Sequence, residues 1–247
     1  DYFSATGQRW GNPIYNWKKL EKEDFSFLIE RLKRNGELYD VIRLDHFRAF
    51  DTYWKIPAKC PTAIDGEWIL APGYRFFEIF LDKCPDIEII AEDLGELRPH
   101  VDILRQHFDF PGMDVIQFTF EESNIKKKKE HKDFDSVVYV GTHDNDTAIG
   151  FFSSLEKEDQ KLWSKALDEA DVPDGEINDR LINFAMGKNA NYVILTAQDI
   201  LGLGNEGRIN LPGVINDINW TWRMKDFKDL EAKVESLHKL NKEYDRL

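Results

Sequence analysis

The chain has 247 residues, of which 46 are acidic and 33 basic, so its formal net charge at pH 7 is −13. The resulting negative field repels phosphate backbones and anionic lipid, which argues against nucleic acid or a membrane surface as a partner. No apolar run approaches the length needed to cross a bilayer. We therefore expect a soluble, globular protein whose ligand is uncharged.

Cysteine is rare in this chain, which contains only Cys60 and Cys84. A chain of this length can bury a core large enough to fold without disulfide bonds. The cysteine count therefore favours a reducing compartment, and we predict a cytoplasmic protein.

Five short apolar segments are predicted to be buried strands. They are rich in Val and Ile, do not alternate strictly with polar residues, and end in polar or charged residues, as is typical of strands covered on both faces by helices. These segments are 39–47, 87–95, 114–120, 136–144 and 191–201.

Segments with a period of 3.6 residues are predicted to be helices. They are 23–36, 74–84, 100–108, 155–170 and 176–190. Asp24 and Gly36 stand where the N-cap and C-cap of the first helix are expected. Residues 1–20 are predicted to form an ordered loop, and the lysines at 126–129 a solvated helix face. Alternating strands and helices imply an α/β fold, either a doubly wound sheet or part of an eight-stranded barrel.

Three of the predicted strands lead into a carboxylate, namely Asp45, Glu92 and Asp144. One such residue alone is more simply explained as a helix cap or an ion-pair partner. All three follow apolar strands, where an unpaired charge is costly, and each has a further polar neighbour. In a barrel, the carboxyl ends of the strands form one rim that carries the active site, so we expect the three carboxylates to meet there.

Two of these carboxylates are expected to differ in charge. Arg43 and Asp45 are two residues apart on one strand, so they point to the same face and Arg43 favours the ionised form of Asp45. Glu92 follows the apolar sequence IEIIA, where burial is expected to raise its pKa toward that of a general acid. One ionised and one protonated carboxylate are what retaining glycoside chemistry requires.

The segments around the carboxylates resemble three signature regions of the amylomaltase, or disproportionating enzyme, family of 4-α-glucanotransferases. They are RLDHFRAF (43–50), AEDLGEL (91–97) and GTHDNDT (141–147). Further segments match the family in the same order: GQRWGNPIYNW (7–17), YWKIPA (53–58), PGMDVIQFTF (111–120), RINLPG (208–213) and NWTWR (219–223). The resemblance covers nearly the whole chain.

The resemblance implies a catalytic role for each carboxylate. Asp45 would be the nucleophile that forms a covalent β-glucosyl-enzyme, Glu92 the acid/base, and Asp144 the residue that stabilises the transition state. The implied activity is transfer of α-1,4-glucan segments to an acceptor glucose or maltooligosaccharide, with hydrolysis as the minor outcome. Neither a cofactor nor a metal is expected.

The resemblance also implies a set of substrate-binding residues. Arg43, His46 and His143 match positions that bind the sugar at the subsite where cleavage occurs. Gln8 and Trp10 match a loop that lines the substrate groove, and Asn210 matches a polar contact near the active site. Two simpler roles stay open, because Trp10 can pack on the barrel rim and Asn210 can shape the turn before Pro212.

The family has further sequence, including the early barrel strands, before the segment that matches DYFSATG here. We therefore expect residues 1–247 to form a single domain that is the later portion of a (β/α)8 TIM barrel. Such a partial barrel has open edges, so the N-terminal part of the same enzyme is expected as the partner that completes it.

Two other functions can be read from the same residues. A metal-dependent barrel hydrolase could use a hard-metal ligand set formed by Asp45, His46, Glu92, Asp93, His143 and Asp144. Neighbouring residues on a strand point to opposite faces, however, so Asp45 and His46 could not both chelate without distortion. A non-catalytic glucan-binding module would keep the aromatic residues but would not need the three carboxylates.

Overall fold

The computed structural model describes residues 5–95, 97–119 and 136–247. The chain divides into two compact units, Asp1–Met113 and Asp114–Leu247. The lysine run at 126–129, Glu96 within the motif 91–97 and Phe120 at the end of the motif 111–120 lie outside the described residues.

The first unit contains a parallel pair of strands, β1 (Val41–Leu44) and β4 (Glu88–Ala91), which confirms two of the predicted strands. In their register Leu44 lies opposite Ala91, so the two strands end side by side. The carboxylates that follow the strands therefore lie at the same edge, because parallel strands present their carboxyl ends together.

Both strands are shorter than predicted. After β1 the chain turns at His46, which has a left-handed backbone (φ 51°), and enters a 3₁₀ helix, η1 (Phe47–Phe50). A second, antiparallel pair, β2 (Thr52–Lys55) and β3 (Glu67–Leu70), was not predicted. Of the two, β3 is largely exposed, and a long loop joins the strands, so the pair lacks the short turn that marks a hairpin.

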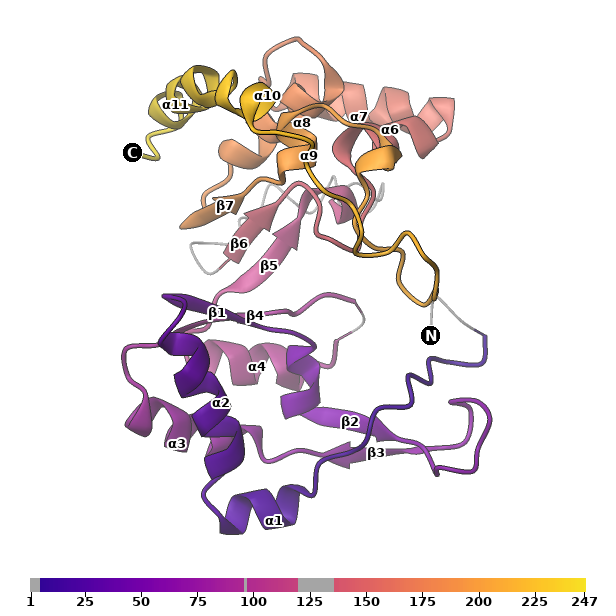
Figure 1. Ribbon diagram of the computed structural model, residues 1–247, viewed down its shortest axis with the longest axis vertical. Helices are drawn as coiled ribbons and strands as arrows, with labels where there is room; N and C mark the ends of the chain where they lie inside the picture. Colours follow the sequence, from indigo (N-terminus) through magenta and orange to yellow (C-terminus); the bar gives the residue numbers. More distant parts are fainter. Residues whose placement is uncertain (1–4, 96, 120–135) are drawn as a thin grey trace. The chain divides into compact units, whose positions relative to one another are not determined.

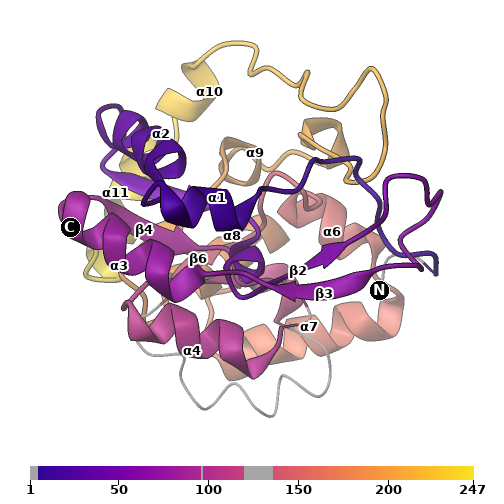
Figure 2. The ribbon, with the colours of Figure 1, turned by 90° about the horizontal axis from the view of Figure 1, so that it is seen from below.

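α-Helices accompany these strands in the described part of the first unit (Figures 1 and 2), and all but the first confirm predicted helices. They are α1 (Trp17–Lys22), α2 (Ser26–Gly36), α3 (Gly73–Lys83) and α4 (Pro99–His107). The prediction of a loop over residues 1–20 is wrong at its end, because α1 begins at Trp17. Its N-cap, Asn16, accepts a hydrogen bond of 3.2 Å from the backbone N–H of Lys19.

The predicted caps of α2 are also wrong. Asp24 and Phe25 both have left-handed backbones (φ 47° and 52°), and Phe25 occupies the N-cap with its side chain fully buried. Gly36 is the last residue inside the helix, and Glu37 is the C-cap. A Cβ on Gly36 would approach the side chain of Ile87 to 2.5 Å, so close packing explains the glycine better than a cap does.

Phenylalanines form the centre of the first unit's core, which also includes aliphatic residues of α2, β4 and α4. The buried phenylalanines are Phe25, Phe47, Phe76, Phe77, Phe80 and Phe110. Phe47 in η1 stacks on Phe77 of α3, with ring centroids 5.5 Å apart. Burying a side chain of this size contributes about 1.5–3 kcal/mol, so the core fixes the turn at His46 that precedes Phe47.

A three-stranded sheet has the order β5 (Gly112–Val115), β6 (Ser136–Tyr139) and β7 (Tyr192–Ile194). The boundary between the two units falls within β5, and β6 and β7 pair in parallel in the second unit. The predicted strand at 114–120 is misplaced, because the chain leaves β5 at Val115 and forms a 3₁₀ helix, η2 (Ile116–Phe118).

The predicted strand at 191–201 is too long, because a short helix, α9 (Ala197–Ile200), follows β7. Thr196 is its N-cap, with a hydroxyl that accepts a 3.2 Å hydrogen bond from the N–H of Asp199. A Thr at the end of an apolar strand is thus a helix-start signal that the apolar pattern concealed.

The second unit confirms the two long predicted helices as α7 (Lys157–Glu169) and α8 (Ile177–Met186). The other helices of this unit were not predicted: α6 (Ala148–Ser154), η3 (Asn205–Gly207), α10 (Lys228–Glu231) and α11 (Val234–Glu243). Its core joins Val138 of β6 to Trp163 and Leu167 of α7 and Leu181 of α8.

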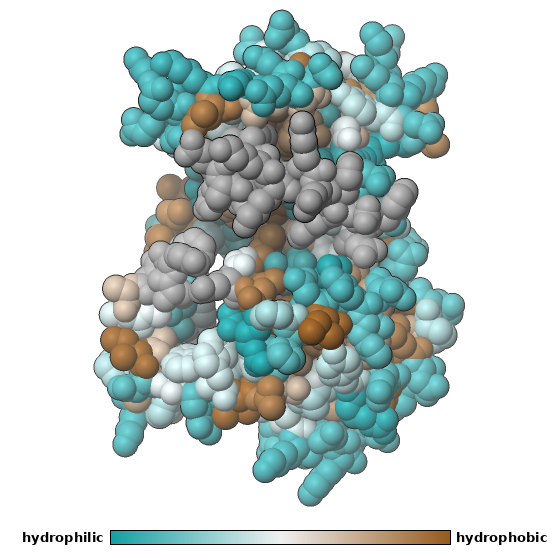
Figure 3. Space-filling view, turned by 180° about the vertical axis from the view of Figure 1, so that it is seen from behind, coloured by the Kyte–Doolittle hydropathy of each residue, from teal (hydrophilic) through white to brown (hydrophobic). Residues whose placement is uncertain are grey.

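Among the residues coloured in Figure 3, hydrophilic side chains predominate, with separate hydrophobic patches between them. Cys60 and Cys84 are both free thiols. Among the described residues, no helix combines the length and the apolar character that a membrane crossing demands.

Candidate active site

Asp45 is the first residue after β1, and its side chain is exposed. The Nη1 atom of Arg43 lies 2.8 Å from Oδ1 of Asp45, so the two side chains lie on the same side of the strand as predicted. Arg43 also directs its Nε toward the Sδ atom of Met113, at 3.2 Å. The guanidinium is thereby held beside Asp45, whose carboxylate remains accessible to a ligand.

Glu92 follows β4 and is half-buried. Its Oε2 accepts a 2.7 Å hydrogen bond from the backbone N–H of His46, and its Oε1 accepts one of 3.1 Å from the N–H of Leu94. Two backbone donors therefore fix the orientation of the carboxyl group.

Burial raises the pKa of Glu92 above its ordinary value. The hydrogen bonds from Leu94 and His46 oppose the shift, the nearby negative charge of Asp45 adds to it, and the positive charge of Arg43 opposes it. Desolvation is the largest of these effects, so the predicted direction is confirmed. Glu92 thus holds a proton at a higher pH than an exposed glutamate does.

The turn at His46 places its backbone, as well as its side chain, at the site. The left-handed backbone of His46 turns its N–H toward Glu92, a conformation that costs free energy in a residue other than glycine. Two further backbone bonds of 3.0 Å support the turn, from Phe47 N–H to Glu92 O and from Glu92 N–H to Leu44 O. The sequence indicated only side-chain roles for His46, a sugar contact or a metal ligand, and gave no sign of this backbone role.

Asp93 faces the opposite way from Glu92, into the core. Its buried carboxylate accepts a 2.7 Å hydrogen bond from the N–H of Met113 and lies 3.4 Å from Nε of Arg105. This arrangement removes Asp93 from the predicted site and gives it a structural role.

Asp144 lies in the second unit, in the loop after β6. Its Oδ1 accepts a 2.6 Å hydrogen bond from Nδ2 of Asn210, and Nε2 of His143 lies 3.4 Å from its Oδ2. Its backbone N–H donates to the hydroxyl of Thr142 at 3.3 Å. Asn210 therefore contacts a predicted catalytic residue directly and does more than shape the turn before Pro212.

Trp220 is an aromatic residue that packs beside His143. Its ring centroid lies 5.2 Å from that of His143, and its backbone N–H donates a 2.8 Å hydrogen bond to Ile209 O. The backbone N–H of Asn210 donates to His143 O at 3.1 Å. The sequence segment NWTWR pointed to this region but did not distinguish Trp220 from its neighbours.

Gln8 and Trp10 lie on an exposed N-terminal segment of the first unit, and Trp10 is 60% exposed. The segment is anchored by Arg9, whose Nη2 donates a 3.0 Å hydrogen bond to Ala58 O. The backbone carbonyl of Thr6 on the same segment accepts a 3.1 Å hydrogen bond from the N–H of Ala63.

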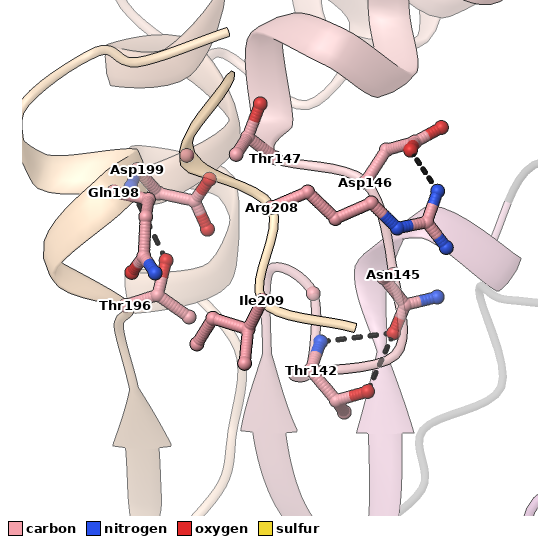
Figure 4. A pocket seen from close by; sticks show the side chains of 11 residues that line it. Thr142, Asn145, Asp146, Thr147, Thr196, Gln198, Asp199, Arg208 and Ile209 are labelled. Carbon is pink, nitrogen blue, oxygen red and sulfur yellow. Dashed lines mark hydrogen bonds and ion pairs between the residues drawn. The ribbon is translucent and has the colours of Figure 1, made fainter. Parts of the chain in front are cut away.

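A small pocket in the second unit lies next to the Asp144 loop (Figure 4). It is lined by Gly141, Thr142, Asn145, Asp146, Thr147, Thr196, Gln198, Asp199, Gly207, Arg208 and Ile209. The pocket has room for roughly one water molecule, so it is too small to be the sugar-binding site. Burial raises the pKa of Asp199 in its wall, against hydrogen bonds from Ala148 and Thr196.

The structure assembles the predicted residues in two groups, one in each unit. The first unit brings together Arg43, Asp45, His46 and Glu92, and the second brings together His143, Asp144 and Asn210. Within residues 5–95, 97–119 and 136–247, no three His, Cys, Asp or Glu side chains are grouped so that they could hold a metal ion.

An arginine-paired carboxylate beside a half-buried carboxyl group with a raised pKa, at the ends of parallel strands, is typical of enzymes that act on glycosidic bonds. The 4-alpha-glucanotransferase family model of glycoside hydrolase family 77 matches residues 1–230. The chain belongs to this family.

Individual relatives agree with the family match. A 4-alpha-glucanotransferase of Thermus thermophilus is 41% identical over 230 residues, which cover 91% of this chain and 46% of the relative. One from Synechocystis is 43% identical over 226 residues, covering 90% of this chain and 44% of the relative. This chain thus spans about half the length of the relatives it matches.

Solved structures extend the agreement to the fold. The amylomaltase from Streptococcus agalactiae in complex with acarbose superposes with a TM-score of 0.90 at 32% identity, over all of this chain and 50% of that chain. The amylomaltase from Corynebacterium glutamicum, at 17% identity, has a TM-score of 0.77 over all of this chain and 41% of that chain, and shares the fold.

Proposed function

We propose that this chain is the carboxyl-terminal part of the catalytic barrel of a 4-α-glucanotransferase. The enzyme would transfer segments of α-1,4-glucan to an acceptor glucose or maltooligosaccharide, with retention of configuration. The observation that carries the proposal is the pair Asp45 and Glu92, in which one carboxylate is exposed beside an arginine and the other is half-buried with a raised pKa. Membership of the family supports the same reaction.

In the first step the carboxylate of Asp45 attacks the anomeric carbon and forms a β-glucosyl ester. The bond from that carbon to the leaving oxygen breaks, and Glu92 gives its proton to this oxygen. The leaving segment departs with its new hydroxyl group. The raised pKa of Glu92 supports this role, because the group must be protonated before the bond breaks.

In the second step a hydroxyl of the acceptor sugar attacks the same anomeric carbon. The ionised Glu92 takes the proton of that hydroxyl, and the ester bond to Asp45 breaks to release the carboxylate. Two inversions at one carbon give net retention. Asp144 would stabilise the positive charge that develops on the sugar in both transition states, with Asn210 and His143 as its side-chain neighbours.

The remaining assignments concern the sugar. Arg43, His46 and His143 would contact the glucose unit at the cleavage point, while Gln8, Trp10 and Asn210 would line the groove. The exposure of Trp10 supports a contact with a sugar ring, since an aromatic face accessible to ligand can stack on it.

We infer that residues 1–247 form one domain that is the later portion of a (β/α)8 barrel. The parallel pairs β1–β4 and β6–β7 support this fold. The N-terminal part of the same enzyme would supply the early strands, and α-1,4-glucans are the proposed substrates. A cytoplasmic location is proposed from the scarcity of cysteine, and the potato relative is named as chloroplastic or amyloplastic.

The test uses the complete enzyme with maltotriose as both donor and acceptor. We expect glucose and longer maltooligosaccharides to appear together, and Asp45→Asn to abolish both. Turnover should survive a divalent-ion chelator, because the proposed steps use carboxylates alone; loss that added metal restores would favour a metal-dependent hydrolase. Glucan binding without any bond exchange would favour a non-catalytic module.

A further inference from the structure

Arg208 follows η3 and joins two segments of the second unit that are far apart in the sequence. Its Nη2 donates a 2.7 Å hydrogen bond to the backbone carbonyl of Asp144, and its Nε donates one of 2.8 Å to the carbonyl of Asn210. Its Nη1 forms an ion pair with the carboxylate of Asp146, seen in Figure 4. One guanidinium thus holds three acceptors.

The geometry of these bonds links Arg208 to the orientation of the Asp144 carboxylate. The backbone of Asn210, fixed by Arg208, also donates its N–H to His143 O at 3.1 Å. The side chain of Asn210 then reaches Oδ1 of Asp144 at 2.6 Å. Arg208 therefore restrains Asp144 by two routes, directly at its carbonyl and through Asn210 at its carboxylate.

The positive charge of Arg208 is balanced by the negative charge of the Asp146 carboxylate. Both side chains are only 23% exposed, and the backbone carbonyl of Asp146 accepts a 2.7 Å hydrogen bond from Nε2 of Gln117. Arg208 bonds to the backbone carbonyl of Asp144 and not to its carboxylate, so the guanidinium controls where Asp144 lies. A planar group with donors in fixed directions can hold several acceptors at once, which a lysine ammonium on a flexible stem cannot do.

We propose that Arg208 is a positioning residue that sets the Asp144 carboxylate for transition-state stabilisation, an inference that rests on the proposed function. The charge that Asp144 would stabilise develops only as the glycosidic bond breaks. Misplacing the carboxylate therefore affects turnover more than it affects substrate binding. A displacement of about 1 Å at such a site can lower the rate by about 100-fold.

The experiment compares Arg208→Lys with Arg180→Lys in the complete enzyme, with maltotriose as the substrate. Arg180 is a suitable control because it is a buried arginine of the same unit that pairs with Asp168, on helices α8 and α7. We expect Arg208→Lys to lower kcat by about 10- to 100-fold with KM changed less than about threefold. Arg180→Lys should leave both values near those of the parent enzyme.

A double variant tests the route through Asn210. If the two residues act together, Arg208→Lys combined with Asn210→Ala should be about as slow as the slower single variant. Losses that multiply, or an Arg208→Lys variant that raises KM with kcat unchanged, would overturn the proposal. Should Arg208→Lys fail to fold, Arg208→Gln takes its place: it removes the fork of donors that holds the carbonyls of Asp144 and Asn210. A kcat equal to that of the parent would overturn the proposal.

Asp144→Asn separates this inference from the proposed function. If Asp144→Asn retains full transferase activity, the catalytic assignment itself fails. If Asp144→Asn is inactive while Arg208→Lys keeps the parent kcat, only the role of Arg208 fails.

Discussion

The backbone N–H of His46 donates a 2.7 Å hydrogen bond to Oε2 of Glu92, a residue 46 positions later in the chain. This bond favours the ionised carboxylate, whereas burial favours the protonated acid, and burial has the larger effect. A residue that must release and recover one proton in each catalytic cycle benefits from both influences, since neither form is then excluded.

Removing the carboxylate of Asp45 or of Glu92 should strongly lower the turnover of the complete enzyme while leaving it folded. Glu92→Gln is expected to lower kcat by about 10²–10⁴-fold, because general acid–base catalysis contributes about that factor. Asp45→Asn should be at least as slow, since no glucosyl ester can form. The exposed carboxylate of Asp40, just before β1, offers the control Asp40→Asn, which should keep full activity. Mass spectrometry of a trapped intermediate that finds the sugar on any residue except Asp45 would contradict the assignment.

The rate should fall as the pH rises through the pKa of Glu92. Because this pKa is raised, the protonated acid persists above the pH at which an exposed glutamate ionises, and the alkaline limb moves upward with it. An activated glucosyl fluoride needs no proton on its leaving group, so its glycosylation step should lack this limb. An identical alkaline limb with both substrates would show that another group controls it.

The same shift predicts how stability depends on pH. A carboxyl group whose folded pKa is raised stabilises the fold below its unfolded pKa, and this contribution is lost as the pH rises through the folded pKa. Glu92→Gln does not titrate, so its unfolding free energy relative to the parent should increase between about pH 4 and pH 8. Chemical denaturation at the two pH values measures the difference, and a constant difference would contradict the raised pKa.

Asp93→Ala should destabilise the protein by about 3 kcal/mol, because it removes the buried carboxylate that pairs with Arg105 and the acceptor of the N–H of Met113. Asp102 also lies near Arg105, at 3.7 Å, but its side chain is 54% exposed. Asp102→Ala should therefore cost less than about 1 kcal/mol. Urea denaturation of the complete enzyme compares the two variants, and equal midpoints would refute the structural role of Asp93.

A retaining mechanism predicts both the anomeric configuration of the first product and the distance between the two catalytic carboxyl groups. Proton NMR should detect the α anomer first when the complete enzyme acts on an α-glucan. The carboxyl groups of Asp45 and Glu92 should stand about 5–5.5 Å apart in the complete enzyme, since no water has to fit between them. A spacing of roughly 6.5–9.5 Å, or a β product, would require an inverting mechanism.

The sequence by itself determined the features that depend on local spacing. Apolar runs and a period of 3.6 residues located β1, β4, α2, α3 and α4, because burial of a strand or helix face imposes its own repeat. Strand alternation likewise placed Arg43 beside Asp45. The family motifs predicted Asp45, Glu92 and Asp144 as the catalytic carboxylates, but the burial of Asp93 beside Glu92 was not readable from them.

Only the tertiary structure decided the contacts between distant segments. The bond from His46 to Glu92 depends on the register of two strands, and that from Asn210 to Asp144 spans 66 positions. The three bonds of Arg208 were likewise invisible in the sequence. Desolvation and hydrogen bonding depend on which groups surround a side chain, and those groups are brought there by packing rather than by neighbours in the chain.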